Sequence, residues 1–219
     1  IAPNMATMLA FLTTDADVPA PLLQTLLAAE ADRTFNCMTV DGDTSTSDTL
    51  AILANGASGV VVGEGTPEAE AFRAGLFTLC SRLSRELARD GEGATKLVQV
   101  EVTGAVSEAE ARQAARAIAN SLLVKTALFG NDPNWGRILC AAGYSGAQLD
   151  PNAVELTLCG VPLVRAGCPV PFDEETTSRA MREKEIGMVL DLGVGEAAIQ
   201  VWTCDLSYDY VKINAEYTT

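Results

Sequence analysis

The sequence predicts a mixed α/β fold in which short apolar strands and amphipathic helices are interspersed along one chain. Apolar residues make up 48% of the 219 residues and charged residues only 20%, which is typical of a globular protein. Segments with alternating apolar residues, such as 96–106, are interspersed with segments of helical periodicity, such as 66–89. The chain contains no internal repeat and no low-complexity linker.

The character of the chain changes near residue 96, which divides it into two parts. In the first part, leucines recur on one face of 19–31, which indicates a helix. Thr66 followed by Pro67 is typical of a helix start. The loop 41–48 is polar, and its Ser, Thr and Asp residues are typical of the N-terminus of a following helix. The expected elements are a strand at 8–13, a helix at 19–31, a strand at 34–40, a helix at 49–54 and a helix from 66 to about 89.

In the second part, residues 96–106 alternate as a half-buried strand. Ser107 and Glu110 form a capping box that opens a helix to about Leu123. Cys159-Gly160 is the expected turn of a strand pair. The remaining expected elements are a helix at 135–144, paired strands at 154–158 and 161–165, a helix at 174–185, a hairpin of 186–192 with 197–204, and a last strand at 210–216.

The composition excludes several classes of site. The chain has no histidine, so it cannot build a Ser-His-Asp or Cys-His pair by itself and lacks histidine metal ligands. A net charge of −14 argues against nucleic-acid and anionic-membrane partners. No segment is long and apolar enough to span a membrane. The scattered cysteines indicate reduced thiols rather than a disulfide framework or a zinc site. They are Cys37, Cys80, Cys140, Cys159, Cys168 and Cys204.

The stretch Pro3-Asn4-Met5-Ala6-Thr7-Met8-Leu9 is typical of a self-cleaving precursor, because a small residue precedes a threonine and an apolar strand follows. Cleavage between Ala6 and Thr7 would make Thr7 an N-terminal nucleophile whose own α-amine acts as its base. An α-amine has a pKa of about 7.7–8.0, which suits a base near neutral pH. The alternative is that Thr7 is an ordinary strand residue.

Three polar loops are candidate binding sites. The first, 41–48, crowds carboxylates and hydroxyls, but Ile52 stands where an EF-hand requires glutamate. The second, 90–96, places Glu92 between two glycines, which permits close approach of a ligand or makes an ordinary turn. The third, 130–137, combines Asn, Asp, Trp and Arg, which are costly to bury unless they satisfy one another.

Together these segments resemble one family, the bifunctional glutamate N-acetyltransferases, or ornithine acetyltransferases, of arginine biosynthesis. The resemblance spans nearly the whole chain and corresponds to the β subunit, preceded by six residues from the end of the α subunit. The matching stretches are 1–9, 39–46, 90–96, 131–137 and 213–217.

The resemblance implies an acyltransferase whose precursor cleaves itself between Ala6 and Thr7. Thr7 would take the acetyl group of N-acetylornithine as an ester and pass it to glutamate, and some family members also accept acetyl-CoA. Glu92, Asn214 and Thr219 would bind the substrate, and Glu92 suits a cationic amine. The chemistry needs no metal or bound cofactor. If Ala6 is still joined to Thr7, the amine is an amide and the form is unprocessed.

The resemblance also implies a layered αββα sandwich core shared with an α subunit, plus a smaller α/β domain. Residues 1–95 would belong to the core, 96–205 to the smaller domain, and 206–219 would return to the active site. The expected assembly is a dimer of αβ pairs in the cytoplasm or, alternatively, in the mitochondrial matrix. The α subunit would supply the oxyanion donors.

Two other functions are compatible with the residues. An N-terminal-nucleophile aminopeptidase or amidohydrolase would share Thr7 but pass the acyl group to water. A non-catalytic structural subunit would leave the chemistry to its partner.

Overall fold

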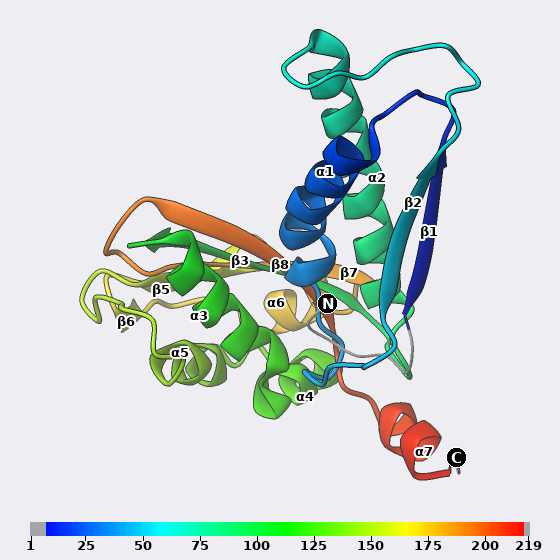
Figure 1. The fold of residues 1–219 in the computed structure, drawn as a ribbon. Helices are drawn as coiled ribbons and strands as arrows, with labels where there is room; N and C mark the ends of the chain where they lie inside the picture. Colours follow the sequence, from blue (N-terminus) through cyan, green and yellow to red (C-terminus); the bar gives the residue numbers. More distant parts are fainter. Residues whose placement is uncertain (1–7, 217–219) are drawn as a thin grey trace. The chain divides into compact units, whose positions relative to one another are not determined.

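The computed structural model describes residues 8–216. The chain divides into two compact units, residues 1–87 and 88–219, which are described separately below. Helices and strands are mixed in both units, and the sheets contain parallel and antiparallel pairs (Figure 1). The predicted mixed α/β class is confirmed.

The first unit is a two-stranded parallel sheet packed against two helices (Figure 1). Leu9 of β1 pairs with Thr49 of β2, and the register continues to the end of both strands. Leu12, Leu27 and Leu76 pack into one apolar core between the sheet and the helices. The elements are β1 (Leu9–Thr14), α1 (Ala20–Arg33), the short 3-10 helix η1 (Phe35–Cys37), β2 (Thr49–Ala54) and α2 (Pro67–Arg89).

In this unit the predicted β1, α1 and α2 are confirmed, whereas two expectations are wrong. The segment expected as a helix at 49–54 is strand β2, because pairing with apolar β1 overrides the helix preference of its Leu and Ala residues. The strand expected at 34–40 is the turn η1, in which the N–H of Cys37 bonds to the Thr34 carbonyl at 2.8 Å.

The second unit is built on a six-stranded mixed sheet of order β6-β5-β4-β7-β3-β8, in which only β3 and β7 run parallel. Helix α3 packs on β3 and β8, and α3, α4 and α5 lie on the same face of the sheet (Figure 1). The elements are β3 (Leu97–Ala105), α3 (Glu108–Asn120), α4 (Leu122–Gly130), α5 (Trp135–Gly143), β4 (Glu155–Leu158), β5 (Val161–Arg165), β6 (Cys168–Pro169), α6 (Glu174–Ala180), β7 (Glu185–Asp191), β8 (Ala197–Cys204) and α7 (Tyr208–Glu216).

The expected hairpin of 186–192 with 197–204 is wrong. Both strands exist, but β3 lies between them and pairs with each. The intervening turn wraps over the end of β3, where the N–H of Val194 bonds to the Gly104 carbonyl at 2.9 Å. Gly195 allows this close approach, because a Cβ there would overlap the Ala105 carbonyl.

The last strand expected at 210–216 is also wrong, since these residues form helix α7. The helix expected from Ser107 to Leu123 breaks at Ser121, which caps α4 through the N–H of Val124. The helix expected at 174–185 ends at Ala180. The N-cap by Ser107 is confirmed, as are helix α5 and the antiparallel pair β4–β5.

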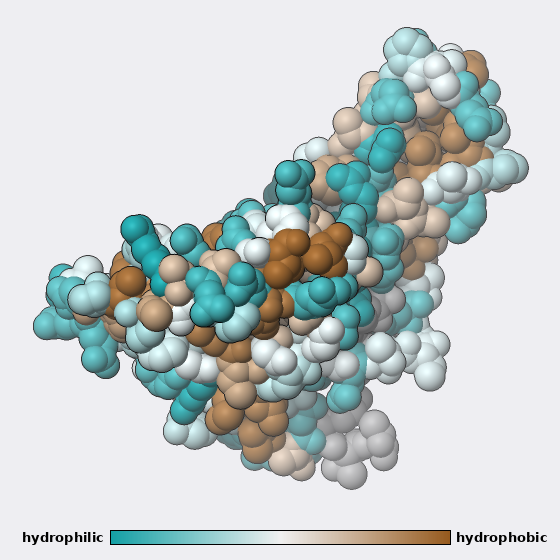
Figure 2. Space-filling model, turned by 90° about the vertical axis from the view of Figure 1, so that its left-hand side faces the viewer, coloured by the Kyte–Doolittle hydropathy of each residue, from teal (hydrophilic) through white to brown (hydrophobic). Residues whose placement is uncertain are grey.

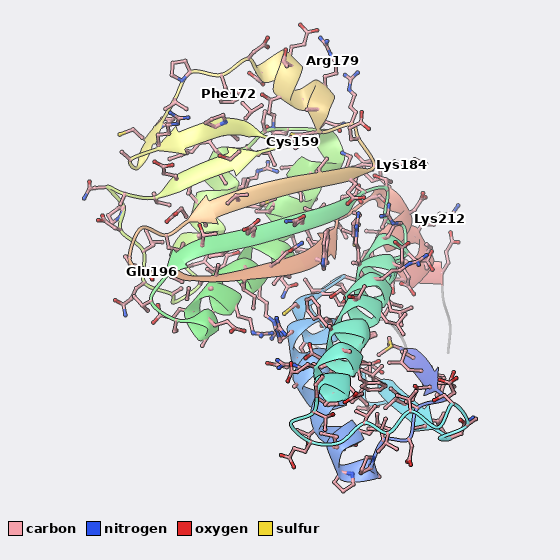
Figure 3. The ribbon with its side chains drawn as sticks, turned by 90° about the horizontal axis from the view of Figure 1, so that it is seen from above. Cys159, Phe172, Arg179, Lys184, Glu196 and Lys212 are labelled. Carbon is pink, nitrogen blue, oxygen red and sulfur yellow. The ribbon has the colours of Figure 1, made fainter. Side chains whose placement is uncertain are left out.

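Figure 3 looks onto the face of the six-stranded sheet opposite α3, with Lys184 and Glu196 at the two ends of the sheet. Lys212 of α7 lies at the same end as Lys184.

The side seen in Figure 2 is largely hydrophilic, with separate hydrophobic patches. No helix between residues 8 and 216 is long and apolar enough to cross a membrane.

Candidate active site

Ala6 and Thr7 flank the expected cleavage site, and Thr7 is the expected nucleophile. Both lie outside the described residues, as does Thr219. Met8 directly follows Thr7 in the sequence. The N–H of Met8 donates to Asp48 Oδ1 at 2.9 Å, and its carbonyl accepts from the N–H of Thr49 at 2.8 Å. The polar loop 41–48 therefore ends beside the residue next to the expected nucleophile. It does not cap a helix, because strand β2 follows it.

Two of the predicted substrate-binding residues meet in the second unit. Asn214 Nδ2 donates to Glu92 Oε2 at 2.8 Å and to the Tyr210 carbonyl at 3.0 Å. Glu92 lies in the loop 90–96, and Asn214 lies on α7, near the end of the chain. The fold thus places a carboxylate beside a carboxamide, an arrangement that can bind a cationic amine and an amide group together.

Backbone contact holds the loop against the start of α7. Gly93 has φ of +66°, and a Cβ there would overlap the backbone nitrogen of Tyr210. Ser207 Oγ donates to the Gly93 carbonyl at 2.5 Å and accepts from the N–H of Asp209 at 3.1 Å. Glycine at position 93 is therefore required by close approach as well as by its backbone conformation.

A buried carboxylate, Asp205, fixes the other end of the same loop. It is 2% exposed and accepts from the N–H groups of Thr95 at 2.8 Å and Lys96 at 3.0 Å, and from the Thr95 hydroxyl. Three donors satisfy this buried charge. Sequence reasoning assigned Asp205 no role. The available signal was a carboxylate directly after the apolar strand at 197–204.

Lys96 connects this loop to the third polar loop. Its ammonium donates to Asn131 Oδ1 at 2.7 Å and to the Leu128 carbonyl at the end of α4. Burial lowers the pKa of Lys96, and the negative charge of Asp205 partly offsets this effect. Asn131 adopts the left-handed conformation, with φ of 57°, that commonly ends a helix.

The rest of the third loop is explained by local structure. Asn134 caps α5 by accepting from the N–H of Arg137 at 3.2 Å. The Arg137 guanidinium donates to the Leu123 carbonyl at 2.9 Å. Within residues 8–216 no cluster of three or more Cys, Asp or Glu side chains is arranged to hold a metal ion.

A profile of the ArgJ family matches residues 1–219. The "Arginine biosynthesis bifunctional protein ArgJ" of Symbiobacterium thermophilum is 53% identical over the whole of this chain and 55% of its own length. The protein of the same name from Thermus thermophilus is also 53% identical, with 56% of its length covered. The chain thus spans about half the length of the curated relatives it matches.

A crystal structure of the arginine biosynthesis bifunctional protein ArgJ from Bacillus halodurans matches the fold with a TM-score of 0.93 at 42% identity. The match covers 96% of this chain and 100% of the solved chain. The sequence match and the structural match therefore both point to the same family along the chain. This protein belongs to the ArgJ family.

Proposed function

We propose that this chain is the nucleophile-bearing subunit of an arginine-biosynthesis enzyme that transfers an acetyl group from N-acetylornithine to glutamate. The observation that carries the proposal is the pairing of Glu92 with Asn214 in a member of the ArgJ family. Two residues expected to bind the same substrate, 122 positions apart, are hydrogen-bonded to one another.

The proposed chemistry begins with cleavage between Ala6 and Thr7, which frees the α-amine of Thr7. The amine takes the hydroxyl proton as Thr7 Oγ1 attacks the acetyl carbonyl of N-acetylornithine. The amide C–N bond then breaks, the proton passes to the leaving nitrogen, and ornithine departs from an acetyl-threonine ester. The amine of glutamate attacks this ester, which gives N-acetylglutamate and restores the hydroxyl.

Glu92 and Asn214 are proposed to bind the substrate, with the Glu92 carboxylate facing a cationic amine of ornithine. Thr219 is proposed to assist them. Acetyl-CoA is a proposed second acetyl donor, in keeping with the word "bifunctional" in the names of the relatives. The names of the rice relatives, which are 46% identical, include the word "chloroplastic". We place this protein in the cytoplasm, with an organelle as the alternative.

An exposed apolar sheet face in the first unit supports the proposal that a partner supplies the rest of an αββα core. Leu9, Phe11 and Leu53 project from the face of the β1–β2 sheet opposite α1 and α2, and each is more than half exposed. Apolar residues on both faces are typical of a sheet that is covered on both sides. The part of the curated relatives that this chain does not span is the proposed partner, in a dimer of αβ pairs.

The test begins with the whole precursor and the N-terminal sequence of the cleavage fragment that contains the residues after Ala6. We expect a start at Thr7 in the wild type and no cleavage in Thr7→Ala. Release of free acetate without glutamate would instead favour an amidohydrolase. An assembled Thr7→Ala enzyme with full transferase activity would identify this chain as a structural subunit.

A further inference from the structure

We propose that Asp205 is a positioning residue that holds Glu92 and Asn214 as a pair selective for the primary ammonium group of the substrate. The inference rests on the proposed function, because it requires this pair to bind the substrate. It deepens that function in two ways. It derives from the hydrogen bonds of the pair which ligand atoms the pair accepts, and it assigns a role in specificity to a carboxylate that is itself buried.

The Glu92–Asn214 pair presents acceptor atoms to a ligand. Asn214 Nδ2 donates to Glu92 Oε2 at 2.8 Å and to the Tyr210 carbonyl at 3.0 Å, so both of its hydrogens have an acceptor within the protein. The atoms that remain for a ligand are Asn214 Oδ1 and Glu92 Oε1, and both are oxygens. A primary ammonium has three donors and no acceptor, so it matches these two oxygens, whereas a carboxylate does not.

A short segment between β8 and α7 sets the positions of both side chains. Asp205 Oδ1 accepts from the N–H groups of Thr95 and Lys96, at the end of the loop that carries Glu92. The Thr95 hydroxyl donates to the other oxygen of Asp205. Helix α7, which carries Asn214, begins three residues after Asp205. The carboxylate therefore holds the loop of one partner, while the backbone of the same residue leads into the helix of the other.

Loss of the Asp205 carboxylate should disturb the pair more than the rest of the substrate site. Hydrogen bonds from backbone N–H groups to a carboxylate are stronger than those to a neutral acceptor. Without them, two N–H groups of the loop lose their acceptor and the loop can shift relative to α7. A displacement of about 1 Å is enough to weaken a positioned contact strongly. The ammonium should therefore lose contact with one of its two oxygens, while the remainder of the substrate keeps its contacts.

The test compares N-acetylornithine with N-acetylnorvaline, which has the same carbon chain but lacks the terminal amine. The enzyme is produced from the whole precursor. The readout is the KM for N-acetylornithine against the inhibition constant of N-acetylnorvaline, which is measurable whether or not the analogue is turned over. Asp205→Ala should raise this KM by about 10–100-fold and change the inhibition constant by less than about twofold. The preference for the ammonium is the ratio of the two constants, and it falls accordingly.

Two variants serve as controls. Asp205→Asn should keep most of the preference, because its carboxamide can accept from both N–H groups and can donate to the Thr95 hydroxyl oxygen. Asp191→Ala removes a carboxylate that accepts from the N–H of Gly193 at 2.8 Å, at the opposite end of the β3–β7 pair. It should leave the preference unchanged, although it also removes a carboxylate that holds a turn.

Thr95→Val tests the same contact with less disturbance, because it removes the hydroxyl that donates to Asp205 and nearly keeps the side-chain volume. It should lower the preference by about three- to tenfold, and it decides the test if Asp205→Ala does not fold. An unchanged preference in the deciding variant would overturn the inference. Equal changes in the two constants would also overturn it, because they would indicate a general loss of structure. If the wild type transfers no acetyl group from N-acetylornithine, the proposed function fails and the inference fails with it.

Discussion

The two units differ in how they cover their strands. In the second unit Val98, Val100 and Val102 of β3 are fully buried by helices of this chain. In the first unit Phe11 of β1 is 64% exposed and Leu53 of β2 is 61% exposed, although both are large apolar residues. The second unit therefore completes its sheet–helix layer by itself, whereas the first has an apolar sheet face that requires another layer.

The largest difference is expected from removing a leucine side chain in each unit. Leu190→Ala, in the fully buried centre of the second unit, should lower the free energy of unfolding by about 2–5 kcal/mol. Leu53→Ala should change it by less than about 0.5 kcal/mol in this chain alone. Urea denaturation followed by far-ultraviolet circular dichroism measures both, because helices and strands of both units contribute to the signal. Equal losses would show that the first unit does not have an open apolar face.

The open face should matter for assembly. Phe11→Ala should weaken association with the rest of the precursor by about 1.5–3 kcal/mol, because a buried aromatic side chain is lost from the interface. The unfolding of this chain alone should hardly change. Titration calorimetry of the separately expressed parts measures the affinity. The matched control is Val106→Ala, which removes an exposed apolar residue from the second unit. Equal affinities for both variants would contradict this account.

Ion pairs should show the same contrast on a smaller scale. Glu30 in the first unit has a fully buried side chain and accepts from Arg73 at 2.8 Å. Arg73→Met should lower Tm more than the loss of an exposed pair, because it removes one of two cationic partners from a buried carboxylate. Arg179→Met, which breaks an exposed pair with Glu175 on α6, should cost less than about 0.5 kcal/mol. Thermal melts of the two variants test this, and an equal shift in Tm would refute it.

The smallest expected effect is a difference in the sign of the pH dependence. Burial, aided by the charge of Glu30, raises the pKa of Cys80 to about 11 from an ordinary 9.0. The folded first unit therefore retains a proton that the unfolded chain loses, and stability falls between pH 9.0 and about 11. Burial lowers the pKa of Lys96, so its contribution to the stability of the second unit rises with pH just below 10.5.

The free energy of unfolding is measured across this pH range for the wild type and both variants. The loss of stability above pH 9.0 should be smaller in Cys80→Ala than in the wild type. The gain of stability just below pH 10.5 should be smaller in Lys96→Met than in the wild type. Identical pH profiles for the wild type and both variants would mean that neither burial affects stability.

Much of the fold follows from local patterns. Helix α2 and strand β3 were predicted from Thr66-Pro67 and from period-two alternation, because their signals are local. Strand β2 was predicted as a helix because its Leu and Ala residues favour one. Its strand state depends on pairing with β1, which a local pattern does not contain. The position of β3 between β7 and β8 is likewise a long-range feature.

The same distinction between local and long-range signals applies to the candidate site. Glu92 was predicted from its place between two glycines in a candidate binding loop, whereas Asn214 was predicted only through the resemblance to a family. The structure pairs the two side chains. Asp205 and Asp48 were given no individual role, because isolated carboxylates in a sequence do not reveal which backbone N–H groups they meet. Their partners lie 110 and 40 positions away.

The mass of the N-terminal peptide tests most directly whether Thr7 carries the acetyl group. The processed enzyme is incubated with N-acetylornithine in the absence of glutamate, then quenched and digested. We expect a peptide that begins at Thr7 and is heavier by one acetyl group, and addition of glutamate should remove this group as N-acetylglutamate. An unmodified Thr7 in an enzyme that transfers acetyl at its full rate would contradict the account.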